Sequence, residues 1–208
     1  MSTGASEESL VLLYLYLVGT FAGRARIAED LRLGEGTVRR ILQRLSGAGL
    51  VEKIRAGSRI TRRGTAYVED FLGRMGVKRL VLARVSELEG GLALIALLGS
   101  ARNPGSHVLK LRDAAVREGA AGAIIALREG RALRLPPGGE DLCDYLRDLC
   151  SSISRLAPRS YSAAIIVFGE GFGAPLRGFL GVLSSPYYSL LASGERSLLP
   201  EEFFHRLG

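Results

Sequence analysis

The chain has 208 residues, of which 47% are hydrophobic and 24% charged, and its formal net charge is +7. This length and composition indicate one or two globular domains and exclude a disordered or collagen-like protein. The longest apolar run, residues 10–18, is too short to cross a bilayer and follows no basic segment that would mark a signal peptide. We therefore expect a cytoplasmic protein with no membrane partner.

The choice of polar residues is uneven. Lysine occurs only at positions 53, 78 and 110, so arginine supplies most of the positive charge, and Gln43 and Asn103 are the only side-chain amides. A scarcity of heat-labile amides favours a thermophilic source, although a GC-rich genome also favours arginine, alanine and glycine.

The first predicted helix covers residues 7–18, and its apolar run leaves no polar face. A helix that is apolar all round must be covered on more than one side. We expect the following helices to cover one side. The second cover is either the C-terminal part of the chain or a second subunit, which makes a homodimer one of the expected arrangements.

Two short amphipathic helices follow, over residues 24–31 and about 35–48, with a glycine-containing turn between them. The second helix has one apolar stripe, formed by Val38, Ile41, Leu42 and Leu45 at helical spacing. Residues 50–55 and 59–61 are expected to form two strands around a tight turn at 56–58. The order is therefore helix, turn, helix and hairpin.

This order resembles the winged helix-turn-helix of bacterial and archaeal transcription regulators. The residues that carry the resemblance are Gly36–Leu42, Leu45, Gly49–Lys53 and Ile60–Gly64. It implies that the second helix reads the major groove of DNA. One departure is the N-cap of that helix, where regulators often have Ser or Thr and this chain has Gly34 or Glu35; glycine is a tolerable cap.

The charge pattern supports a polyanionic partner independently of the resemblance. Residues 23–63 contain 11 basic and 4 acidic side chains, so the rest of the chain is neutral. We expect double-stranded DNA to be the partner, and the alternative is a solvated basic face used for protein contacts. The expected major-groove residues are Thr37, Arg39, Arg40, Gln43 and Arg44, and the expected wing contacts are Arg55, Arg59, Arg62 and Arg63.

The remaining chain predicts a helix from about residue 65 to 73 or 76 and then a second domain. The expected strands are 79–85, 92–98, 121–127, 131–135 and 161–168, and the expected helices are 106–118, 140–156 and 176–183, with a short last helix from Pro200. The order β-β-α-β-β-α-β-α makes the fold class α+β, a winged helix (1–76) followed by a mixed α/β layer domain (77–208).

The second domain resembles the C-terminal part of archaeal winged-helix proteins in which that domain is uncharacterised. The resemblance rests on residues 111–115, 119–123 and 130–136. It implies a sensor or oligomerisation role and brings no ligand or catalytic residue with it.

Cys143 and Cys150 fall within one predicted helix. Seven residues of helix correspond to about 10 Å of rise, which is too far for a disulfide. No histidine or third cysteine lies near them, so we expect no metal site and two small buried thiols in a reducing compartment.

Candidate chemistry in the second domain is sparse. Gly169, Gly171 and Gly173 lie between a strand and a helix, where backbone amides can hold an anion, but the spacing is not a dinucleotide fingerprint and a tight turn explains it as well. Arg112 and Asp113 form either a polar effector site or a surface ion pair. We predict no catalytic residue, cofactor or metal. The predicted function is a DNA-binding transcription regulator with a small-molecule effector as an optional partner; the alternative is an enzyme or nucleotide-binding protein with its site in residues 79–208.

Overall fold

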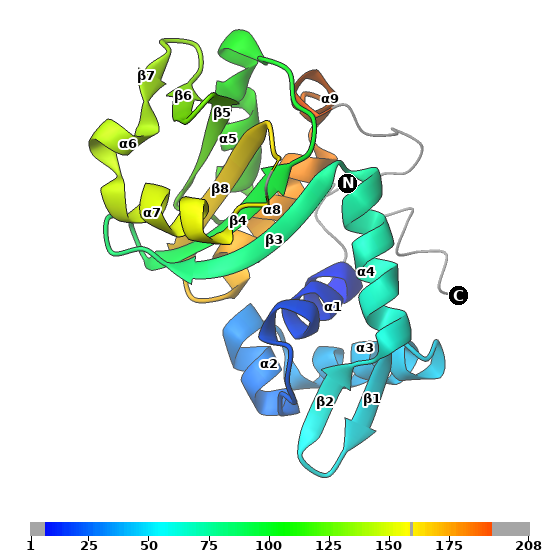
Figure 1. Cartoon of the computed structure of the whole chain (residues 1–208). Helices are drawn as coiled ribbons and strands as arrows, with labels where there is room; N and C mark the ends of the chain where they lie inside the picture. The colour runs from blue at the N-terminus through cyan, green and yellow to red at the C-terminus, as the bar shows by residue number, and fades with distance from the viewer. Residues whose placement is uncertain (1–6, 159, 193–208) are drawn as a thin grey trace.

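A computed structural model describes residues 7–158 and 160–192. In the N-terminal part, three helices precede a two-stranded antiparallel hairpin and a fourth helix follows it (Figure 1). The elements are α1 (Glu7–Val18), α2 (Arg24–Leu31), α3 (Glu35–Gly47), β1 (Val51–Ile54), β2 (Gly57–Ile60) and α4 (Arg62–Arg74). The bounds of α1 and α2 are those that the apolar spacing predicts, and Gly34 is the N-cap of α3.

The start of α4 is earlier than the sequence predicts. Thr61 is its N-cap: the hydroxyl accepts a hydrogen bond from the Gly64 amide at 3.0 Å and donates to the Gly49 carbonyl at 2.7 Å. A side-chain acceptor at this position satisfies an amide of the first turn, which has no partner within the helix. Arg62 and Arg63 therefore lie in the first turn of α4, and their expected place on the hairpin is wrong.

The C-terminal part contains a six-stranded sheet in which every neighbouring pair of strands is antiparallel. In spatial order the strands are β3 (Val77–Arg84), β4 (Gly91–Leu98), β8 (Ala163–Glu170), β5 (Gly122–Glu129), β6 (Ala132–Leu135) and β7 (Glu140–Asp141). The class is α+β as predicted. The two-residue strand β7, the 3₁₀ turn Gly105–His107 and the helix α9 (Tyr188–Leu191) are additions to the predicted order, and the helix predicted from Pro200 lies outside the described residues.

Helices cover both faces of this sheet (Figure 1). The helices α5 (Val108–Arg117) and α8 (Gly173–Ser184) pack on the face that carries Leu94 and Ile165, and α7 (Arg147–Leu156) packs on the face that carries Ile95 and Ile166. Because both faces are buried, the central strands β4 and β8 are apolar at nearly every position, although uninterrupted apolar strands are more usual in parallel sheets.

The prediction of two unpaired thiols on one long helix is wrong. Cys143 lies in α6 (Leu142–Tyr145) and Cys150 in α7 (Arg147–Leu156), and the backbone leaves the helical conformation at Leu146, where φ is −128° and ψ is 75°. The break brings the two Cα atoms to 5.6 Å, and the two sulfurs form a disulfide. The apolar spacing runs through the break, which is why the sequence reads as a single helix.

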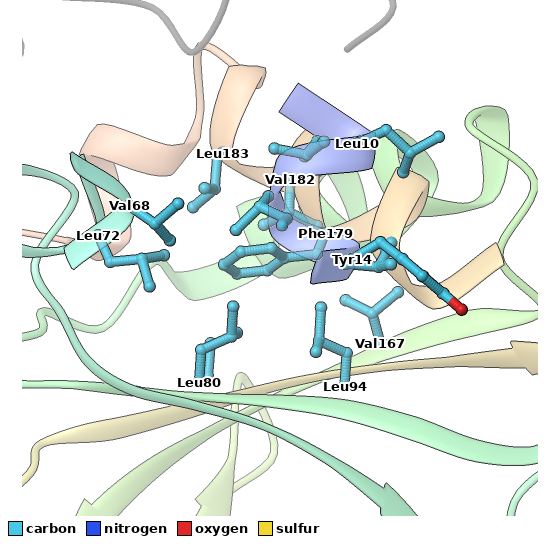
Figure 2. Close-up of a cluster of buried hydrophobic side chains, with 14 of the residues drawn as sticks. Leu10, Tyr14, Val68, Leu72, Leu80, Leu94, Val167, Phe179, Val182 and Leu183 are labelled. Carbon is cyan, nitrogen blue, oxygen red and sulfur yellow. The ribbon is translucent and has the colours of Figure 1, made fainter. Parts of the chain in front are cut away.

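The two parts of the chain share one hydrophobic core, which Figure 2 shows. Leu10 and Tyr14 of α1 lie beside Phe179 of α8, with Leu72 of α4 and Leu94 of β4 around them. The second cover of α1 is thus the chain's own C-terminal part. A homodimer stays a prediction, and it no longer follows from the apolar surface of α1.

Candidate nucleic-acid interface

The helix α3 has one buried and one exposed face. Val38, Ile41, Leu42 and Leu45 are at most 4% exposed and pack on the core, so the side chains between them in sequence must point outward. The exposed side chains are Arg39, Arg40, Gln43 and Arg44, with Thr37 half-buried at the edge. The five residues predicted for the major groove therefore lie on the side of α3 that faces away from the core, as the sequence predicts.

One edge of this face is tied to α1. The Arg44 guanidinium lies 2.5 Å from a carboxylate oxygen of Glu8, whose side chain is 21% exposed. Next to it, Arg40 donates to the Thr37 hydroxyl at 3.4 Å, a long hydrogen bond. Arg44 is thus held towards α1, whereas Arg40, in the middle of the face, has this long hydrogen bond as its one polar side-chain contact among the described residues.

The opposite edge of the face borders the hairpin. Strands β1 and β2 pair from Val51↔Ile60 to Ile54↔Gly57, and Ala22 forms an isolated antiparallel bridge with Ser58 through two backbone hydrogen bonds of 2.9 Å. These bonds fix the hairpin against the segment that leads into α2.

The cations of the hairpin differ in their contacts. Arg59 forms an ion pair with Glu52 and stacks on the Phe21 ring, with its guanidinium carbon 4.6 Å from the ring centre. Arg55 is exposed at the turn, and Arg62 and Arg63 are exposed at the start of α4. Among the described residues, no salt bridge involves Arg55, Arg62 or Arg63, whereas Arg59 is held by Glu52 and Phe21.

A cleft of about 240 Å³ separates α3 from the hairpin. Its polar lining comes from four elements: Arg24 of α2, Arg39 and Gln43 of α3, Lys53 of β1 and Ser58 of β2. Arg24 and Lys53 were not predicted as site residues. Their only signal in the sequence is membership of the basic stretch 23–63, because their convergence on α3 is a product of the tertiary fold.

The glycines of the predicted anion site lie at a junction between the two parts of the chain. A Cβ on buried Gly173 would lie 3.0 Å from the Asp30 carbonyl oxygen, and Arg177 donates to the Leu31 carbonyl at 2.7 Å. The C-terminal end of α2 thus meets the N-terminal end of α8, and the opposite partial charges of these two ends attract. Burial, together with the nearby Arg32 charge, lowers the pKa of Arg177.

Further contacts hold the same junction. Glu170 pairs with Arg32 at 3.4 Å, and the Phe172 and Tyr14 rings meet edge to face at 5.5 Å. The Tyr14 hydroxyl donates to an Asp30 carboxylate oxygen at 2.5 Å. This packing gives the glycine-rich turn a structural role, and anion binding there stays a prediction.

Arg112 and Asp113 are exposed on α5 and are not at that junction. Asp113 lines an open hollow of about 490 Å³ together with Lys110, Val116, Arg117 and Tyr187. Within residues 7–158 and 160–192 no three His, Cys, Asp or Glu side chains come close enough to hold a metal ion. No helix in these ranges is long and apolar enough to span a membrane.

Two family models match separate parts of the chain. Residues 7–66 match the family described as PH0730-like, N-terminal domain, and residues 93–175 match a domain of unknown function, DUF4443. The structure resembles that of the hypothetical protein PH0730 from Pyrococcus horikoshii OT3, with a TM-score of 0.71, 22% sequence identity and coverage of 95% of this chain and 97% of the other. The chain has the two-part fold of that archaeal protein. No curated protein matches it.

Proposed function

We propose that the chain is a transcription regulator that binds double-stranded DNA through a winged helix formed by α1–α4 and the β1–β2 hairpin. The order of these elements, with Ala22 bridged to Ser58 of β2, supports this proposal. In this assignment α3 is the recognition helix and the hairpin is the wing.

The observation that carries the proposal is the exposed face of α3. Arg39, Arg40, Gln43 and Arg44 remain open to solvent, although the C-terminal part of the chain packs against α1 and α2. A row of cations on a helix narrow enough for the major groove, beside a basic hairpin, is an electrostatic match to a DNA duplex.

The proposed DNA contacts are of two kinds, to base edges and to the sugar-phosphate backbone or minor groove. Arg40 points from the middle of the face and can bind a guanine edge with two hydrogen bonds, and Gln43 can bind an adenine edge in the same way. Arg55 at the wing tip would meet the minor groove, and Arg62 and Arg63 would meet backbone phosphates. The C-terminal part would hold the effector or dimer surface of the regulator.

Selection of genomic fragments by the purified protein, followed by gel-shift titration of the recovered sequence, tests the proposal. We expect Arg40→Ala to weaken binding to this sequence by about 1–3 kcal/mol and to relax the base preference at one position. Arg131→Ala, which removes an exposed cation from the β5–β6 turn, is the matched control.

Affinity should also fall steeply with salt, by about 0.9 log units per log unit of salt for each phosphate contact. A protein that recovers no common sequence and shows a flat salt response contradicts the proposal. If the basic face instead binds an acidic protein, pull-down partners will persist after nuclease treatment.

A further inference from the structure

The cleft between α3 and the hairpin gathers positive charge without a matching anion in its walls. Arg24, Arg39 and Lys53 line it, and none of the lining residues is acidic. Glu35, outside the lining, pairs with Arg24 at 3.1 Å. Among the described residues, neither Arg39 nor Lys53 takes part in an ion pair.

Glu35 offsets the charge of Arg24, whereas Arg39 and Lys53 repel each other across the cleft, and the solvent between them reduces this repulsion without removing it. An anion placed between them reverses the sign of the interaction. Because the three side chains stand on α2, α3 and β1, which no local sequence pattern holds together, their convergence needs an explanation beyond a solvated helix face.

The walls of the cleft are fixed before any ligand arrives. Leu42 and Ser58 are 4% and 5% exposed, and the backbone of Ser58 is bonded to Ala22. A preformed site avoids the ordering cost that a mobile loop would add on binding. Exposed Ile54, also in the lining, supplies an apolar wall beside the cations.

The geometry points to a single ligand: we infer that this cleft binds one backbone phosphate of the DNA duplex, an inference that rests on the proposed function. Its volume of about 240 Å³ is below the roughly 300–1,000 Å³ of cavities that enclose a whole small molecule. A phosphate group with part of its sugar fits that space. Arg24, Arg39 and Lys53 supply the charge, the Gln43 amide donates to a phosphate oxygen or an adjacent base, and Ile54 contacts the deoxyribose.

This contact sets the register of α3 on the duplex. The cleft fixes where one phosphate lies relative to the helix, and Arg40, which is outside it, then meets a defined base. The three cations of the cleft are thus positioning residues, which add affinity for every sequence alike, whereas Arg40 and Gln43 add discrimination.

Fluorescence anisotropy with a labelled duplex of random sequence, titrated over a series of KCl concentrations, tests the inference. Because the cleft neutralises one phosphate, the Lys53→Met/Arg39→Met double variant should reduce the magnitude of the log–log salt slope by about 0.9. Each single variant should remove part of that change, and Lys53→Arg should keep the wild-type slope. Arg131→Met removes the same charge outside the cleft and should leave the slope at the wild-type value. A thermal melt of each variant checks that it is folded.

The outcomes separate the two claims. If the wild type binds with a steep slope that the double methionine variant retains, the cleft inference is wrong and the DNA-binding proposal stands. If the wild type binds no duplex, both fail. A second measurement compares the melting temperature in inorganic phosphate with that in chloride at equal ionic strength. Suppose that phosphate raises the melting temperature, that Arg39→Met abolishes this rise, and that the variants keep the wild-type salt slope for the duplex. The cleft would then be a site for free phosphate, and the inference would be overturned.

Discussion

Substitution of Gly64 by alanine should destabilise the protein, although alanine normally favours a helix. Gly64 is the third residue of α4, and its amide is bonded to the Thr61 hydroxyl that caps the helix. A Cβ at this position would collide with the Leu50 carbonyl oxygen and would lie 2.7 Å from Cγ1 of Ile60. The absence of a side chain therefore lets α4 lie directly on the base of the hairpin.

The change in the free energy of unfolding caused by Gly64→Ala is the sum of two opposing contributions. Glycine to alanine inside a helix gains about 1 kcal/mol, whereas forcing atoms into a packed site costs typically 1–3 kcal/mol and more when backbone must move. Here the closest atom is a backbone oxygen, so the cost of the clash should reach the upper end of that range and leave a net loss of about 2 kcal/mol. Gly73 is in the same helix with nothing within 4 Å of its ideal Cβ, so Gly73→Ala should stabilise the protein by up to about 1 kcal/mol.

Urea unfolding followed by circular dichroism measures both variants against the wild type. The two substitutions are chemically identical, so the difference between them isolates the contact with the hairpin. Duplex affinity provides a second readout, because displacement of the hairpin would change the walls of the α3 cleft. A Gly64→Ala protein as stable as Gly73→Ala would refute the packing argument.

Three further outcomes are expected. Phe179→Ala empties a fully buried site between the two parts of the chain and should cost about 3–5 kcal/mol in one unfolding transition; separate transitions in differential scanning calorimetry would contradict a shared core. Cys150→Ala opens the short Cys143–Cys150 loop and should cost about 2.5 kcal/mol in urea, as reduction of the wild type should. Burial and the Asp30 carboxylate raise the pKa of Tyr14 above its ordinary 10.0, so stability present below pH 10 should decline above it, and less so in Tyr14→Phe.

Elements with a clean hydrophobic period were predictable from the sequence. The stripe on α3 predicted both its buried face and its exposed face, so the outward position of the five α3 residues followed from spacing. Their assignment to a DNA-binding site rests on the resemblance and the charge pattern. The error at Arg62 and Arg63 has a local cause: Thr61 reads equally well as the last residue of a strand or as an N-cap. Its hydrogen bonds to Gly49 and Gly64 show that it is the N-cap of α4. Gly49 lies before the first strand of the hairpin, so this contact is not visible in the sequence around Thr61.

The disulfide could not be predicted because the cause of the helix break is distant in sequence. Leu146 interrupts a run whose apolar spacing is continuous. The new helix then starts at Arg147 because the Glu87 carboxylate, from the β3–β4 connection, accepts hydrogen bonds of 3.1 Å from the Asp148 and Leu149 amides. A carboxylate at the start of a helix accepts hydrogen bonds from amides that have no partner within the helix, and it interacts favourably with the positive end of the helix dipole. The sequence of the helix itself does not show that Glu87 lies there.

The same limit applies to the apolar helix α1, and here it bears on function. The sequence required a second cover and left open whether a subunit or the rest of the chain provides it. Phe179 and the α2–α8 junction supply this second cover from within the chain. The junction lies at Leu31, the last residue of α2, shortly before α3 begins at Glu35. The recognition helix of the proposed regulator is therefore packed on elements that are themselves bound to the C-terminal part. A shift of α8 would therefore have to move α2 with it or break the Arg177–Leu31 hydrogen bond, and α2 in turn contacts α3.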